Sequence, residues 1–389
     1  MTSRRHFLKI ALGTGSAVVV AACTPSAPSP SAPAAPGQSA PATAAPASAA
    51  ARRKVTFGIS TTQFLEDTAN YTSLPNVLGF WNDDGLDVTP VGVSGSATNA
   101  QLIVSGQHDA GVPGTSDGVY VTRSKGLRIT AFYNLVNHSF QDPAVPEASP
   151  IQTVADFKGK TIGVQSLSSG TVPVVRAYLS DAGLDPDKDV TFVAVGLGGQ
   201  AAAALFESHQ IDILSLWDGQ YASIENTTPR YKLRVIRPAL GERLGFQVAL
   251  AATDDKLASD RAVMVGLGRG VAKATVFALA NPEAAVRLHW KAFPDARPHN
   301  VSDADAVERG VRTMLARLNN ERIDTAQPPR TRWGFADPQE VQTFYDVLRR
   351  SNSITGELNL NQLYTNDLIE EINRFDVAAI QSMAKTYTL

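Results

Sequence analysis

The sequence predicts an α/β protein with two lobes, in which two parallel or mixed sheets flanked by helices face each other across a ligand cleft. Three observations lead to this fold class. Short β-branched runs alternate with helical stretches from Lys54 onward, a second such series begins at Ile151, and no strand period appears after Ala252. Because strand–helix alternation is typical of parallel sheets with crossover helices, we expect one sheet per series and a helical C-terminal region.

The first series starts where a tract of Ala, Pro, Ser and Thr gives way to apolar runs. Its expected strands are residues 54–59, 87–91, 109–112 and 127–135, and its expected helices are residues 74–83, 97–105 and 115–124. A Pro-rich stretch over residues 142–150 then interrupts the pattern.

The second series has expected strands at residues 161–164, 190–195, 211–216 and 233–236, and expected helices at residues 171–182, 200–208 and 219–225. One more strand, at residues 245–252, precedes expected helices at residues 261–280, 282–292, 303–318, 338–350 and 366–374. We therefore expect lobe I over residues 54–145, lobe II over residues 150–245, and a mostly helical return to lobe I over residues 246–389.

The first 22 residues are typical of the signal peptide of a bacterial lipoprotein. Arg4 and Arg5 form a twin-arginine export motif, and the apolar run over residues 10–22 has the length of a signal h-region. The run ends at Cys23, the single cysteine of the chain. We predict cleavage before Cys23 and attachment of lipid to it, which would hold an extracytoplasmic protein on a membrane. An ordinary signal peptide with a chance cysteine is the alternative.

A tether is predicted to follow, over residues 23–53. Between Thr24 and Ala51 the chain consists almost entirely of Ala, Pro, Ser and Thr and has no charge. Such a segment cannot bury enough apolar surface to offset its ordering entropy, so we interpret it as a solvated spacer.

Composition excludes several classes of protein. The net charge of -2 argues against a general nucleic-acid binder, which would normally be basic. One cysteine excludes an internal disulfide, a multi-cysteine zinc site and a cysteine-ligated iron–sulfur cluster, and the six histidines form no H-E-x-x-H pair. We expect no metal and no cofactor. No run of about 18 apolar residues stands out, so we expect no membrane-spanning helix.

Five parts of the chain carry a likeness to a known family: residues 80–88, 103–111, 156–164 (which begins Asp-Phe-Lys-Gly-Lys), 207–212 together with Trp217 and Asp218, and 364–368. They resemble the periplasmic solute-binding proteins of ABC importers, and among them the group that binds nitrate, sulfonates, taurine or thiamine pyrimidine precursors. The resemblance implies a type II binding fold that closes on its solute, a permease and an ATPase as partners, and a monomer. The family also contains synthases with a cysteine-rich iron site, and the single cysteine excludes that branch.

The candidate ligand residues lie in four Gly/Ser/Thr loops and at one strand end. They are Thr61 and Gln63; Gly95, Ser96 and Ala97; Thr115 and Ser116; Ser168, Ser169, Gly170 and Thr171; and Trp217 and Asp218. Loops of this kind bring backbone N–H groups at helix N-termini close to an anion or another oxygen-rich ligand. They also cap helices in every α/β protein, so a purely structural role is the alternative for each loop. Trp217 could stack on a planar ligand, or be a core residue.

Two motifs suggest other functions. Residues 196–201 match the G-x-G-x-x-A dinucleotide pattern, although an exported protein rarely meets such cofactors. Residues 114–118 match G-x-S-x-G, which would make Ser116 the nucleophile of a tethered hydrolase with a later histidine, such as His138, His209, His289 or His299. A sensor that binds the same solute is a third possibility. The function we expect is non-enzymatic capture of a small polar solute, either anionic or neutral, for import.

Overall fold

The computed structural model describes residues 51–388 except residues 198, 229–230 and 327–328, and it leaves the side chains of Ser116 and Asp117 undescribed. The predicted signal peptide, Cys23 and most of the tether therefore lie outside the described residues.

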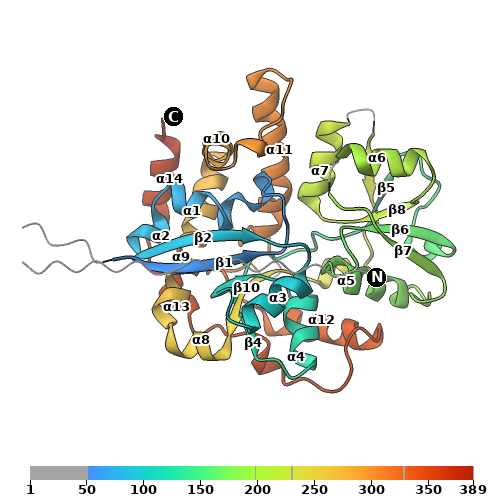
Figure 1. Cartoon of the computed structure of the whole chain (residues 1–389), viewed down its shortest axis with the longest axis horizontal. Coiled ribbons are helices and arrows are strands. Elements are labelled where there is room, and N and C mark those ends of the chain that lie inside the picture. The colour runs from blue at the N-terminus through green and yellow to red at the C-terminus, as the bar shows by residue number, and fades with distance from the viewer. Residues whose placement is uncertain (1–50, 198, 229–230, 327–328, 389) are drawn as a thin grey trace, which may run out of the picture. The chain divides into compact units, whose positions relative to one another are not determined.

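The chain forms two five-stranded sheets, which lie side by side in Figure 1. The first sheet has the order β2-β1-β3-β10-β4, with strands β1 (Arg53–Ile59), β2 (Leu86–Gly92), β3 (Ala110–Val112), β4 (Ile129–Asn134) and β10 (Ala249–Thr253). The second has the order β7-β6-β8-β5-β9, with strands β5 (Ala144–Pro146), β6 (Lys160–Val164), β7 (Val190–Ala194), β8 (Ile213–Ser215) and β9 (Leu233–Val235). Lobe I and lobe II denote these two sheets with the helices packed on them. The predicted fold class is confirmed.

Each sheet is mixed because one strand in each runs against its neighbours. β10 pairs antiparallel with β3 and β4, and β5 pairs antiparallel with β8 and β9. β10 is formed where the chain returns from lobe II, so the polypeptide crosses between the lobes twice, over residues 135–143 and 236–248. The Pro-rich stretch at residues 142–150, expected to be irregular, contains β5. Three residues are too few to show a strand period.

The helices agree with the expected ones in most places. They are η1 (Glu66–Tyr71), α1 (Leu74–Val77), α2 (Phe80–Asp83), α3 (Ser96–Val104), η2 (Ser116–Val121), α4 (Thr122–Ser124), η3 (Val154–Phe157), α5 (Thr171–Asp181), α6 (Gly199–Glu207), α7 (Asp218–Thr227), η4 (Gly241–Arg243), α8 (Asp254–Ser259), α9 (Arg261–Ala280), α10 (Pro282–Ala292), η5 (Pro294–Ala296), α11 (Asp303–Glu321), α12 (Pro338–Arg350), η6 (Leu360–Gln362), α13 (Ile369–Ile372) and α14 (Val377–Lys385). The single helix expected over residues 74–83 is wrong: Gly79, in the left-handed region at φ 75°, separates α1 from α2. The helix expected over residues 366–374 is confined to α13.

The long helix α9 is the central helix of lobe I. By length and composition it could cross a membrane, contrary to the expectation that no such segment exists, yet 72% of its apolar window is buried inside the protein. It packs against β2, β4, α2, α13 and α14. Because the protein itself covers its apolar surface, α9 is a core helix.

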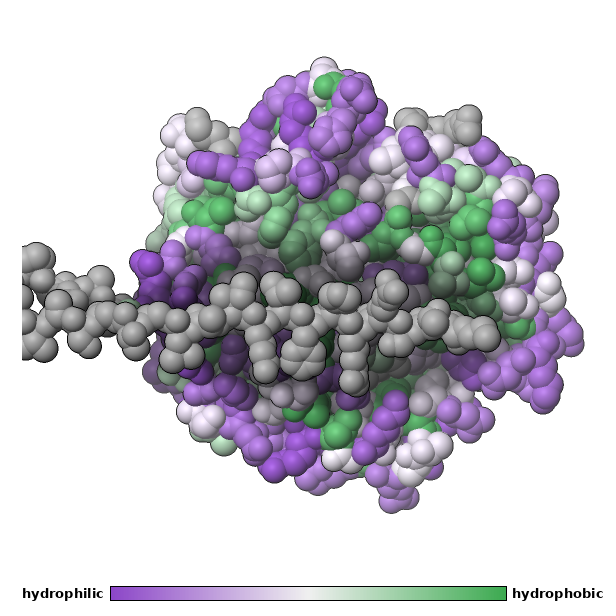
Figure 2. Space-filling model, in the orientation of Figure 1, coloured by the Kyte–Doolittle hydropathy of each residue, from purple (hydrophilic) through white to green (hydrophobic). Residues whose placement is uncertain are grey.

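The helices that follow α9 contact both lobes. α11 packs on η1 and α10 and also on α7 of lobe II, beside which it lies in Figure 1. α12 packs on α5, and its Val341 and Phe344 share a buried cluster with Val174 of α5. Figure 2 shows hydrophilic side chains over the end where α10 and α11 project from the molecule. The C-terminal region is therefore shared between the lobes, not packed on lobe I alone as expected.

Candidate functional site

A cavity of about 60 Å³ lies between the two lobes. Lobe I, the crossover segment 135–143, lobe II and α11 all contribute to its wall. The wall consists of Ile59, Ser60, Thr61, Thr68, Tyr71, Ser96, Val112, Gly114, Phe140, Gln141, Gln165, Ser169, Gly170, Thr171, Trp217, Val248 and Arg317. A cavity formed in this way changes shape whenever the lobes move relative to each other.

The ends of parallel strands bring the predicted loops together. Thr61 follows β1, and Ser96 opens α3 after β2. Ser169, Gly170 and Thr171 lead into α5 after β6. Carboxyl ends of parallel strands meet at one edge of a sheet, so loops that are distant in the chain converge there. The N-terminal ends of α3 and α5 thus face one cavity from opposite lobes.

Three of the predicted residues, Gly95, Ala97 and Ser168, form one of the contacts between the lobes. The backbone N–H of Ala97 donates to the carbonyl oxygen of Ser168 at 3.4 Å. Gly95 has φ 93°, and a Cβ atom there would lie 2.4 Å from Oγ of Ser168. Glycine is needed both for the backbone conformation and for this close approach.

Other predicted residues do not belong to the wall. Thr115 is fully buried, and its hydroxyl donates to the carbonyl oxygen of Phe246 at 2.5 Å. Gln63 is exposed, and its backbone N–H donates to Oγ1 of Thr61 at 3.2 Å. The backbone of Ser116 begins η2, while its side chain lies outside the described residues.

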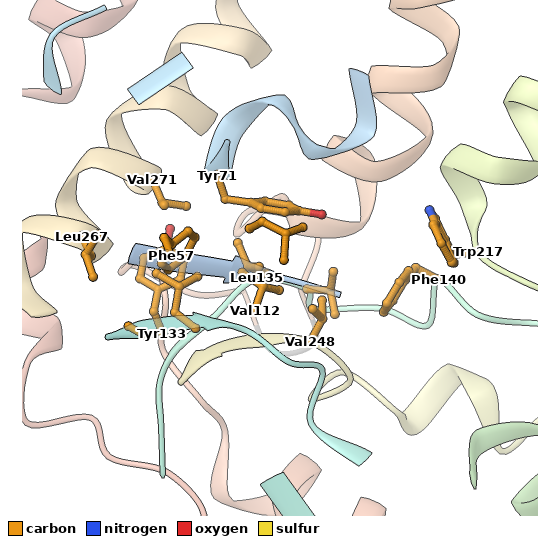
Figure 3. Packing of buried hydrophobic residues seen from close by; sticks show 14 of the residues in the cluster. Phe57, Tyr71, Val112, Tyr133, Leu135, Phe140, Trp217, Val248, Leu267 and Val271 are labelled. Atoms are coloured by element: carbon orange, nitrogen blue, oxygen red, sulfur yellow. The ribbon is translucent and has the colours of Figure 1, made fainter. Parts of the chain in front are cut away.

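Trp217 forms one wall of the cavity, and 8% of its surface is exposed. Its indole Nε1–H donates to Oδ2 of Asp67 in η1 at 2.7 Å. In Figure 3 the hydroxyl of Tyr71 points toward Phe140 and Trp217. These three aromatic residues line one end of the cavity, above Val112 and Val248. A solute at this end would meet ring faces and one hydroxyl group.

Asp218 does not line the cavity, but it forms an ion pair with Arg317, which does. Nε and Nη2 of Arg317 donate to Oδ1 of Asp218 at 3.1 and 2.9 Å, and Nδ2 of Asn320 donates to Oδ2 at 2.8 Å. The guanidinium also lies 4.1 Å from the centre of the Phe140 ring. Sequence reasoning missed Arg317 because it is one of several arginines on a helix remote in sequence from every loop.

One polar atom without a hydrogen-bond partner among the described residues also lies at the site, beside other buried polar side chains. Oε1 of Gln141, which is 9% exposed, has no hydrogen-bond partner among the described residues. Gln165 and Ser96 are buried and lie on the wall. A buried carboxamide oxygen without a hydrogen-bond partner costs free energy. A ligand that donates a hydrogen bond to it would therefore gain more binding free energy than from a bond to a solvated group.

Helix N-termini contribute positive charge to the site, and buried acidic side chains contribute negative charge. The N-termini of α3 and α5 carry partial positive charge, and neither has a side-chain cap. Burial raises the pKa of Asp67 to about 6, although Arg317 and the Trp217 hydrogen bond favour the charged form. The backbone N–H of Thr171 in α5 donates to Oγ of Ser169 at 3.4 Å, and that of Val172 donates to the carbonyl oxygen of Ser169 at 3.0 Å. Since Asp218 pairs with Arg317, the partial positive charge of the two helix N-termini is the feature of the described wall that favours an anion.

Three observations concern the metal, hydrolase and dinucleotide alternatives. They contain no group of three His, Cys, Asp or Glu side chains placed to hold a metal ion. Both ring nitrogens of His289 are engaged, with Ser73 Oγ at 2.7 Å and the Phe64 carbonyl oxygen at 2.8 Å.

In the G-x-G-x-x-A segment a Cβ on Gly199 would lie 1.7 Å from Oγ1 of Thr227, so this glycine serves the close packing of α6 on α7.

The NMT1/THI5-like family model matches residues 74–285, more than half of the chain. The chain belongs to this family. No curated protein matches it.

Solved structures with the same fold include solute-binding proteins. A Bordetella bronchiseptica RB50 protein has a TM-score of 0.61 at 21% identity, covering 82% of this chain and 96% of its own. The alkanesulfonate-binding protein SsuA from Xanthomonas axonopodis pv. citri, bound to MOPS, has a TM-score of 0.59 at 17% identity and 81% and 99% coverage. The nitrate-binding protein NrtA from Synechocystis PCC 6803 has a TM-score of 0.53 at 12% identity and 87% and 99% coverage. At these identities the likeness is one of fold.

Proposed function

We propose that this protein is the extracytoplasmic solute-binding component of an ABC importer and that it captures a small polar monoanion between its lobes. The observation that carries the proposal is the cavity between the lobes, where the N-termini of α3 and α5 converge from opposite sides. An anion at this point would contact both lobes at once. Binding would therefore favour the closed state through contacts that an open state lacks.

The size of the cavity favours a small ligand. About 60 Å³ accommodates roughly four to six water-sized groups, since one water needs about 10–15 Å³ on this measure. Nitrate and methanesulfonate fall in this range. The absence of an unpaired cation on the described wall favours one negative charge over two, because the charge of Arg317 is already balanced by Asp218.

The fold relatives support the same class of solute. SsuA from Xanthomonas is an alkanesulfonate-binding protein, and NrtA is a nitrate-binding protein. Both ligands carry a compact oxyanion, which helix N-termini bind through backbone N–H groups without needing a paired cation.

Isothermal titration calorimetry of the purified protein with nitrate, methanesulfonate, taurine, sulfate and an aminopyrimidine tests this function. We expect nitrate or methanesulfonate to bind and sulfate to bind at least tenfold more weakly. Ser169→Ala should weaken binding, whereas Ser208→Ala, on the exposed end of the α6 segment, should not. Absence of binding by every monoanion, or equal binding by sulfate, would contradict the proposal.

The N-terminal sequence supports a location outside the cytoplasm. We propose that Cys23 carries the lipid and that residues 23–53 act as a spacer between the membrane and the lobes. The protein, as a monomer, would deliver its solute to a permease in that membrane, and an ATPase would drive the transport. Replacing Cys23 by Ser should move the protein from the membrane to the soluble fraction. Retention in the membrane fraction would remove Cys23 as the anchor.

A further inference from the structure

Two neighbouring carboxylates on η1 accept hydrogen bonds from two different tryptophans. Oε1 of Glu66 accepts from Nε1 of Trp290 at 2.6 Å, and Oδ2 of Asp67 accepts from Nε1 of Trp217 at 2.7 Å. Trp290 belongs to α10 and packs in a buried cluster of lobe I. Trp217 is the residue before α7 of lobe II. Of the two pairs, only the one made by Asp67 joins the lobes.

The first turn of α7 contains a glycine, Gly219, that lies against Asp67. A Cβ atom on Gly219 would lie 2.2 Å from Oδ2 of Asp67, so α7 can come this close only with glycine at that position. Asp67 is 2% exposed. Such a close approach between elements that are far apart in the sequence indicates that α7 packs against η1 in one defined arrangement.

Arg317 extends this contact into the cavity. Its Nη2 lies 2.9 Å from Oδ1 of Asp218 and 3.9 Å from Oδ2 of Asp67, and its side chain lines the cavity. One cation therefore faces a carboxylate of each lobe and the space for the solute. We refer to Asp67, Trp217, Asp218, Gly219 and Arg317 as the interlobe latch.

Outside the latch, several hydrogen bonds join α7 to α11. Nδ2 of Asn226 donates to the carbonyl oxygen of Arg309 at 3.0 Å and to Oγ1 of Thr313 at 3.1 Å. Nη1 of Arg309 donates back to the carbonyl oxygen of Asn226 at 2.8 Å. Water can replace hydrogen bonds of this kind when the surfaces part, and polar contacts are typical of domains that move relative to each other.

We propose that Asp67 is a positioning residue that holds the lobes closed through the interlobe latch and thereby sets solute affinity without contacting the solute. The closed arrangement brings Trp217 and Arg317 together on the cavity wall, so opening the latch separates these two parts of the solute site. This inference rests on the proposed function for its effect on affinity, but the closure itself does not depend on the identity of the solute.

The two tryptophan–carboxylate pairs provide a matched experiment. Asp67→Asn and Trp217→Phe alter the pair that joins the lobes, and Glu66→Gln and Trp290→Phe make the same changes within lobe I. The radius of gyration of each purified variant is measured by small-angle X-ray scattering, with and without methanesulfonate and nitrate. The dissociation constants are measured in parallel, and thermal unfolding verifies that each variant is folded.

We expect Asp67→Asn and Trp217→Phe to increase the radius of gyration of the solute-free protein and Asp67→Asn to weaken solute binding about tenfold, as expected for loss of a buried charged partner. Both control variants should keep the wild-type radius. A wild-type radius for Asp67→Asn would overturn the latch, as would an equal expansion of Glu66→Gln. If the wild type binds no solute, the proposed function fails, and the radii still decide the latch.

Discussion

Glu66 and Asp67 are adjacent in sequence and have similar surroundings, yet they act on different parts of the molecule. Both are buried, both accept an indole N–H, and burial raises their pKa values to about 7 and about 6. Trp290 joins Glu66 to the interior of one lobe, whereas Trp217 joins Asp67 to the other lobe. The same hydrogen bond therefore stabilises a core in one case and contributes to a contact between lobes in the other.

The largest expected difference between the two pairs is in stability. Trp290→Ala should cost about 3–5 kcal/mol of unfolding free energy, because it leaves a cavity in a buried cluster and an unpartnered Glu66. The packing is tight, since a Cβ on Gly310 would lie 2.7 Å from the Trp290 ring. Chemical denaturation of Trp290→Ala and Trp217→Ala measures this. Equal losses would show that Trp217 is as much a core residue as Trp290.

A third buried carboxylate, Glu321, tests how the burial of an acid makes the stability of the protein depend on pH. Burial raises the pKa of Glu321 to about 8, against the opposing effect of Arg317. A raised pKa means that the folded state favours the protonated form, so the stability from this group is present at low pH and is lost as the pH rises through about 8.

Between pH 6.5 and 8.5 Glu321 alone should lower the unfolding free energy by about 2 kcal/mol. His289, whose pKa burial lowers to about 4, is neutral throughout this range and adds no slope. Denaturation at both pH values should show a smaller loss for Glu321→Gln than for the wild type. Identical losses in the two proteins would mean that Glu321 is ionised in the folded state at pH 6.5.

The smallest expected effect concerns the cavity. Trp217→Ala should weaken solute binding at least tenfold, or about 1.4 kcal/mol, while the protein remains folded. The reason is the loss of one wall and of the donor to Asp67. Calorimetry with the best monoanion measures the change. Unchanged affinity in a folded variant would remove Trp217 from the solute site.

Much of the fold could be predicted from local patterns. Every strand except β5 lies within or overlaps an expected range, because β-branched runs bounded by turn residues show a strand locally. β5 has three residues and is a strand only because β8 and β9 lie on either side of it. α14 was not expected either, and Ala384 is its single buried residue among those described.

The candidate site was predictable to a similar extent. The loops containing Thr61, Ser96 and Thr171 stand out as small polar residues at strand ends. The residue type does not show whether a side chain faces the cavity, because that depends on the local conformation of the backbone. Thr115 has the same chemistry as Thr171, yet its hydroxyl bonds to the Phe246 carbonyl oxygen.

By itself the sequence determined the alternation of strands and helices, the position of the polar loops and the features of an exported, lipid-bearing N-terminus. These properties depend on periodicity and turn chemistry within a few residues. Only the tertiary structure decided that Asp67 meets Trp217, 150 residues away, and that Arg317 pairs with Asp218 across 99 residues. The strength of such contacts comes from burial and from exact distances between atoms, which arise only when both lobes and α11 are packed together.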